Sequence, residues 1–281
     1  MNITITFCEG PHDVAFLSRI LKIDFYKTYH IQIKDYPEPL NEIFENSMKN
    51  QKYDELNIEQ ISSRVLPRKI LKKDDNIILL YALGGNRQYD RAREILDVFS
   101  IMIQNDDDLI GVDNNNSYNF LFFNDADEDL DTEVTKINKF LTEYYNKSIS
   151  LSHNNIEDAK GIYIFSHDGI KGTLESLLKS IVQIDNEELC IDIDNFYTKY
   201  FNQGKMKRLK LINKDGVLTE KRDKKQKEYK TKATINIAGQ LQNSGVSQVV
   251  TIEHSDLITL HKLKSDDNVK DIVKFFRKVE R

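Results

Sequence analysis

The chain has 281 residues, and its 40 Lys and Arg against 45 Asp and Glu give a net charge of -5. That length can bury a large core, and the acidic balance excludes a generally basic nucleic-acid coat, although not a local basic surface. No apolar run is long enough to span a membrane, the first residues lack the basic segment of a signal peptide, and two cysteines suit the reducing cytoplasm, where we expect the protein.

Strand and helix patterns alternate from the first residues onward. The apolar run 2–8 predicts a buried strand, and 13–21 follows as an amphipathic helix with a single apolar face. Residues 24–75 do not continue this order and are predicted to be an insertion. Within it, 29–33 has the composition of a strand.

The alternation resumes after the insertion. Further strands are predicted at 76–83, 118–123 and 161–165, and further helices at 89–103, 132–145 and 174–181. A strand followed by a helix, four times over, predicts an α/β fold in which helices flank a central parallel sheet with right-handed crossovers.

The remaining part of the chain, 181–281, is predicted to be mostly helical, with helices at 191–201, 233–242 and 269–279. Between the first two of these lies a strongly basic segment, 205–232. In an otherwise acidic chain such a segment favours contacts with a phosphate backbone over a merely solvated surface.

Two acidic motifs follow predicted buried strands. Glu9 and Asp13 lie in the turn and helix start after the first strand, and Asp125 and Asp127 follow the strand 118–123. If these strands are parallel neighbours, their carboxyl ends meet at one edge of the sheet, where α/β proteins place their sites. Clustered carboxylates repel one another and need a cation, and oxygen ligands alone indicate Mg²⁺ or Mn²⁺.

The order of these motifs resembles the Toprim domain. That resemblance rests on a strand ending in Glu9-Gly10 with Asp13 three residues later, a strand ending in Gly84-Gly85, and a strand ending in Asp125-Ala126-Asp127. It covers residues 1–180, apart from the insertion at 24–75. The segments Gly172-Thr173-Leu174-Glu175 and Lys232-Ala233 are similar to those of small stand-alone Toprim-like proteins.

The resemblance implies roles for individual residues. Glu9 would be the general acid/base, and Asp125 and Asp127 would hold Mg²⁺. As in the overcoming-lysogenization-defect nucleases, Asp13 would be a further metal or outer carboxylate. Glu175 would be a ligand for a second ion, and Lys232 a catalytic lysine.

Other site types fit the sequence less well. A calcium loop starting at Asp125 would need Gly at its sixth position, where Leu130 stands. A haloacid-dehalogenase phosphatase would have Gly-Thr after Asp127, and Glu128-Asp129 departs from this. The adjacent residues 166–168 (Ser-His-Asp) cannot face one another as a hydrolase triad, and no nucleophile elbow is present.

Within the Toprim superfamily, topoisomerases need further large domains, for which this chain has no room, and primases need a zinc module, which two cysteines cannot build. Of the activities in this superfamily, hydrolysis of DNA or RNA is therefore the one that fits the chain. We therefore expect a metal-dependent nuclease, with a non-catalytic module that binds nucleic acid or a partner protein as the alternative. Small nucleases of this superfamily act in phage defence beside an ATPase. Because the chain has no phosphate-binding loop motif, that ATPase would be a separate subunit. A homo-oligomer is also compatible with the sequence.

Overall fold

A computed structural model describes residues 1–49, 66–84, 88–108, 116–166, 169–201, 209–222 and 230–280. A seven-stranded sheet forms its centre, in the order β2-β3-β4-β1-β5-β7-β6. The strands of this sheet are β1 (Asn2–Cys8), β2 (Lys27–Thr28), β3 (Lys69–Lys73), β4 (Asn76–Ala82), β5 (Ser117–Asp125), β6 (Asn155–Glu157) and β7 (Lys160–Phe165).

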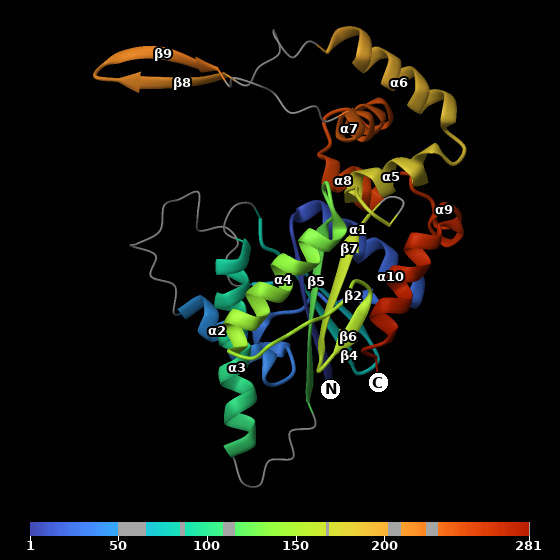
Figure 1. Ribbon diagram of the computed structural model, residues 1–281. Helices are drawn as coiled ribbons and strands as arrows, with labels where there is room; N and C mark the ends of the chain where they lie inside the picture. Colours follow the sequence, from blue (N-terminus) through green and yellow to red (C-terminus); the bar gives the residue numbers. More distant parts are fainter. Residues whose placement is uncertain are drawn as a thin grey trace.

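The four inner strands β4, β1, β5 and β7 are parallel, whereas β3 and β6 pair antiparallel at either side and β2 extends the β3 side. The parallel strands therefore end at a common edge of the sheet. Figure 1 shows this edge facing α5 and α7, with both termini at the opposite end of the molecule.

Helices cover both faces of the sheet. They are α1 (Pro11–Ile20), α2 (Leu40–Lys49), α3 (Gln88–Asp108), α4 (Leu130–Tyr145), α5 (Leu174–Gln183), α6 (Glu187–Tyr200), α7 (Lys230–Gln242), α8 (Gln248–His254), α9 (Leu260–Ser265) and α10 (Asp267–Arg277), with short 3-10 turns η1 (Leu21–Asp24) and η2 (Ile33–Asp35). The predicted α/β class, with flanking helices and a helical C-terminal region, is confirmed.

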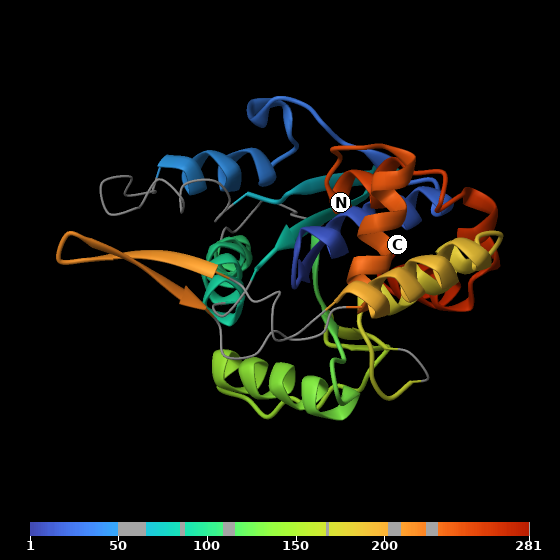
Figure 2. The same cartoon turned by 90° about the horizontal axis from the view of Figure 1, so that it is seen from above.

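Each strand supplies alternate side chains to two separate cores, because successive side chains of a strand point to opposite faces. Phe122 stacks on Phe7 with ring centroids 4.8 Å apart, in the core shared with α2, α3 and α4. Its neighbour Phe123 stacks on Phe276 at 5.3 Å, in the core shared with α1, α5 and α7–α10. Figure 2 shows α3 and α4 on one side of the sheet and α7 and α10 on the other.

The C-terminal helices thus form part of the layer that covers the sheet. Polar contacts fix their position: the Asn2 Nδ2 donates to the Val279 carbonyl at 2.6 Å, and Asp24 pairs with Arg277 and, at 3.0 Å, with Lys73. The contacts of Asn2 with Val279 and of Asp24 with Arg277 join residues from opposite ends of the sequence.

The predicted strand at 29–33 is wrong. The short strand β2 ends at Thr28, and Ile33–Asp35 forms a 3-10 turn. The Tyr29 and Tyr36 rings meet edge to face at 5.2 Å, and the Tyr36 hydroxyl donates to the Tyr29 carbonyl. This packing turns the segment back on itself and overrides the local strand propensity.

Several elements were not predicted from the sequence. The strands β3 and β6 and the helices α8 and α9 were missed, and α3 continues to Asp108, beyond the end of the helix predicted at 89–103. The basic segment contains β8 (Leu209–Lys214) and β9 (Val217–Arg222), which form a separate antiparallel ribbon that projects from the body of the protein (Figure 1). Within the described ranges, no helix is both long and apolar enough to cross a membrane.

Candidate functional site

The candidate site lies where β1 and β5 end. Cys8, the last residue of β1, pairs with Phe123 on one side and with Ala82 of β4 on the other. Hydrogen bonds from the Gly84 N–H to the Glu9 carbonyl (2.7 Å) and from the Ala126 N–H to the Phe165 carbonyl (2.9 Å) continue the ladder past the strand ends. The two predicted acidic motifs are therefore neighbours in space, as the parallel arrangement required.

Glu9 lies at the centre of this edge. The residue borders solvent, but its carboxyl group is partly enclosed by neighbouring residues. Burial raises the pKa of this carboxyl, and the negative charges of Asp127, Glu133 and Glu175 raise it further, while a hydrogen bond from the Asp125 N–H lowers it. Glu9 is thus disposed to hold a proton more tightly than an isolated glutamate.

Asp13 is almost fully buried in the first turn of α1. Its Oδ2 accepts a hydrogen bond from the Gly10 N–H at 2.6 Å, which closes the turn between β1 and α1. Burial and the charges of Glu9 and Glu175 raise the pKa of this carboxyl to about 8, although the Gly10 hydrogen bond and Lys232 oppose the shift. At neutral pH, Asp13 is therefore a mostly protonated carboxyl.

Asp125 ends β5 and contacts the start of α5. Its Oδ1 accepts from the Leu174 N–H at 2.7 Å, one of the amide groups that a helix N-terminus leaves without an intrahelical partner. Burial, followed by the charges of Asp13 and Glu9, raises the pKa of the Asp125 carboxyl well above its usual range. This carboxyl group therefore joins the site to α5.

Asp127 lies further out and is exposed. Its backbone has a positive φ of 50° and exchanges two hydrogen bonds with Gly172, at 2.9 and 3.1 Å. The segment 169–173 is thereby fastened against the Asp-x-Asp motif, which brings the predicted Gly-Thr-Leu-Glu segment to the same edge of the sheet.

Glu175, in the first turn of α5, is buried and lies beside a lysine and a histidine. The Lys232 Nζ lies 3.2 Å and the His12 Nδ1 3.6 Å from its Oε1. Burial alone would raise the pKa of this carboxyl, but the His12 hydrogen bond and the Lys232 charge lower it to about 2. The structure thus brings the predicted Lys232 to the site from α7, where it neutralises Glu175.

Two residues of this group were not singled out from the sequence. His12 stands between the predicted Glu9 and Asp13 and contacts Glu175. Glu133, buried in the first turn of α4, raises the pKa of Glu9 and is paired with Lys136. A first-turn acid on the helix after the Asp-x-Asp strand could have been predicted, because that turn adjoins the same sheet edge. Gly85 of the Gly-Gly motif lies outside the described residues, as do His167 and Asp168.

The carboxylates at this edge are the type of ligand that a divalent cation prefers, but those that the structure describes are not arranged around a common point. Burial and the charges of neighbouring carboxylates raise the pKa values of Glu9, Asp13 and Asp125, and a bound cation would offset the repulsion. Among the described residues, however, no three His, Cys, Asp or Glu side chains converge closely enough to enclose a metal ion. Mg²⁺ keeps several waters and takes only one or two protein carboxylates, so Asp125 and Asp127 would suffice.

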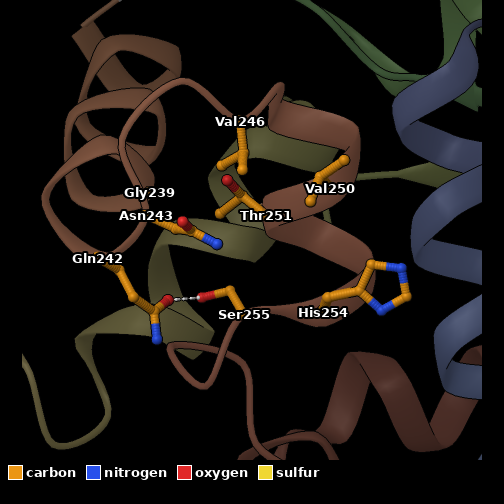
Figure 3. Close-up of a pocket in the computed structure, with 8 residues that line it drawn as sticks. All are labelled: Gly239, Gln242, Asn243, Val246, Val250, Thr251, His254 and Ser255. Atoms are coloured by element: carbon orange, nitrogen blue, oxygen red, sulfur yellow. Dashed lines mark hydrogen bonds between the residues drawn. The ribbon is translucent and has the colours of Figure 1, made fainter.

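A cavity of about 370 Å³ lies elsewhere, between the C-terminal half of α7 and α8. In Figure 3, Gln242 and Ser255 are hydrogen-bonded to each other at its wall, and His254 lies at one side. It is lined by Gly239 and Asn243 at the end of α7 remote from Lys232. His254 is the only ionisable residue among the described residues that line this cavity, whereas the edge where β1 and β5 end brings several carboxylates and Lys232 together.

The sequence matches no protein-family model, and no curated protein matches it. Among solved structures, the crystal structure of a hypothetical protein from Pyrococcus horikoshii OT3 is similar over 99% of this chain and 95% of that one, with 17% identity and a TM-score of 0.49. Neither the identity nor the score is high enough to carry an inference about function.

Proposed function

We propose that this chain is a Toprim-like, divalent-metal-dependent nuclease that hydrolyses phosphodiester bonds. The observation that supports it most is the meeting of Glu9, Asp13 and Asp125 at the carboxyl edge of one parallel sheet, where burial and neighbouring carboxylates raise their pKa values. Such repulsion costs the metal-free protein stability, and a bound cation would offset it.

The bound Mg²⁺ or Mn²⁺, held by Asp125 and Asp127, would supply positive charge to the attacking and leaving oxygens of the phosphodiester. Glu9, whose pKa is raised, accepts the proton of the attacking water and returns a proton to the leaving oxygen. Asp13 remains protonated or orients a water in the outer shell. Lys232, 3.2 Å from Glu175, is placed to stabilise charge on the phosphate.

The proposal includes nucleic acid as the partner and a cytoplasmic setting. It also includes a role in phage defence beside a separate ATPase subunit, which rests on the family resemblance alone.

One observation favours a second candidate, a non-catalytic module that binds nucleic acid or a partner protein. Glu175, the implied ligand of a second ion, is already paired with Lys232 and lies against His12. A site that works with one ion does not need Glu175 as a ligand, so the nuclease remains the better interpretation.

The test is cleavage of labelled plasmid, single-stranded DNA, transfer RNA and ribosomal RNA by the purified protein, with Mg²⁺, Mn²⁺ or a chelator. We expect cleavage of at least one substrate that the chelator abolishes and that Asp127→Asn abolishes without loss of the fold. The matched control is Asp131→Asn, which removes a nearby acid in the first turn of α4. Cleavage by Asp127→Asn at the wild-type rate would refute the assignment.

A further inference from the structure

The ribbon formed by β8 and β9 carries its lysines on one face. Lys210 lies directly opposite Lys221, and Lys214 lies opposite Val217 next to the turn. Residues opposite each other in an antiparallel pair share a face, and so do residues two and four apart on a strand. Lys210, Lys214 and Lys221 therefore point to the same side.

The turn of the ribbon is well defined by the sequence. Asp215 and Gly216 have φ values of 52° and 81°, as a two-residue type I′ hairpin requires. The strands of the ribbon are thus held in a fixed register, and the lysine face is a property of that register.

This arrangement is unfavourable for the isolated protein. Like charges directly opposite each other destabilise an antiparallel pair, and a lone two-stranded hairpin is only marginally stable in water. Within the part of the chain that the structure describes, none of these three ammonium groups has a carboxylate at ion-pair distance, and all three residues are exposed. An anionic ligand would remove the repulsion and support the ribbon.

We infer that the ribbon binds double-helical DNA by lying in its major groove with the lysines on the flanking phosphates. This rests on the proposed nuclease function and specifies its substrate. The major groove of B-form DNA, about 12 Å wide, admits a two-stranded ribbon, whereas the major groove of A-form RNA is too deep and narrow. Lys210 and Lys214 lie about 13 Å apart along the strand, so the lysines reach phosphates along the groove as well as across it.

The ribbon is joined in sequence to the elements of the site. It lies between α6 and α7, and the first turn of α7 carries Lys232 to Glu175. DNA held by the ribbon is thereby bound by the same part of the chain that brings the ammonium group of Lys232 to Glu175.

The opposite face carries Leu209, Leu211 and Leu218, all exposed. A second copy of the chain could cover these leucines instead, and the experiment separates the two occupants. Charge decides in favour of DNA, because a second copy on the leucine face would leave the three lysines without a counter-charge, whereas DNA on the lysine face supplies one.

The experiment measures binding of a short labelled DNA duplex in chelator, across a range of salt concentrations, for wild type and for Lys210→Ala/Lys214→Ala/Lys221→Ala. Loss of three phosphate contacts should weaken binding and reduce the slope of log affinity against log salt by about 2 to 3. A control, Lys27→Ala/Lys34→Ala/Lys264→Ala, removes equal charge from exposed lysines elsewhere and should keep the slope. Arg at the three ribbon positions should also keep it, which separates charge from folding.

The same sequence as an RNA duplex and as single-stranded DNA should bind more weakly than the DNA duplex. An unchanged slope in the alanine variant, or equal affinity for the RNA duplex, would overturn the inference. So would a change of oligomeric state in Leu211→Ser/Leu218→Ser together with unchanged DNA binding by the lysine variant. Because no cleavage is involved, ribbon-dependent binding without hydrolysis in Mg²⁺ would reject the proposed function and leave this inference standing.

Discussion

Asp13→Asn should stabilise the metal-free protein at neutral pH. The raised pKa of Asp13, about 8 against 3.8 in the unfolded chain, means that the native state binds more protons than the unfolded state between these values. Stability therefore falls as the pH rises through this window, and the loss at pH 7 is about 4 kcal/mol at roughly 1.4 kcal/mol per pH unit.

Asparagine keeps the shape of Asp13 and an oxygen that can accept from the Gly10 N–H, but it carries no charge. A weaker hydrogen bond from the Gly10 N–H to the amide oxygen would cost about 1 kcal/mol. The variant has no carboxyl group that must take up a proton on folding, and this is the larger effect, so the net gain should be about 3 kcal/mol at pH 7.

Urea unfolding in chelator measures this difference, at about pH 7 and again near pH 4, where the gain should largely vanish because Asp13 is then partly protonated in the unfolded wild-type chain as well. Asp24→Asn is the control of opposite sign. Asp24 is buried too, but Arg277 and Lys73 lower the pKa of its carboxyl, so its loss should destabilise the protein at pH 7. A destabilised Asp13→Asn, or a gain that does not change with pH, would refute the reasoning.

Three further changes test other parts of the structure. Glu9→Gln should lower the cleavage rate by about 100-fold or more while substrate binding is kept, since it removes the proton acceptor; an unchanged pH–rate profile would exclude Glu9 from the chemistry. Lys232→Ala should reduce turnover more than binding, measured as kcat against Kd, and normal turnover would show that its contact with Glu175 is structural. Gly161→Ala should lower the free energy of unfolding, measured with urea, by about 1–3 kcal/mol, because the added Cβ would lie 2.8 Å from Ile156 and 2.9 Å from Phe275. Equal stability would mean that the side chains of this core rearrange to make room for the methyl group.

Strong hydrophobic periodicity made the inner strands predictable. The apolar run at 2–8 coincides with β1, and the expectation that β1 and the strand before Asp125 are parallel neighbours correctly placed Glu9 near Asp125. Here local pattern and tertiary packing agree, because a fully buried parallel strand must be apolar throughout.

Edge strands and long-range contacts were harder to predict. β3 has the sequence Lys-Ile-Leu-Lys-Lys, which shows no strict alternation, and its pairing with β4 depends on residues that only the fold brings together. The β8–β9 ribbon did carry a local signal, Asp215-Gly216 between two extended runs, which predicts a type I′ hairpin but was obscured by the high charge of the segment. The neutralisation of Glu175 by Lys232 joins α5 and α7 and has no local signature at all.

The central claim is that the carboxylates at the ends of β1 and β5 bind a divalent ion. Electron paramagnetic resonance of Mn²⁺ titrated into the protein measures free ion directly and needs no knowledge of the substrate. We predict saturable binding by the wild type that is competed by Mg²⁺ and lost in Asp125→Asn/Asp127→Asn, with Asp131→Asn binding as the wild type does. Wild-type protein that binds no more Mn²⁺ than the double variant would contradict the account.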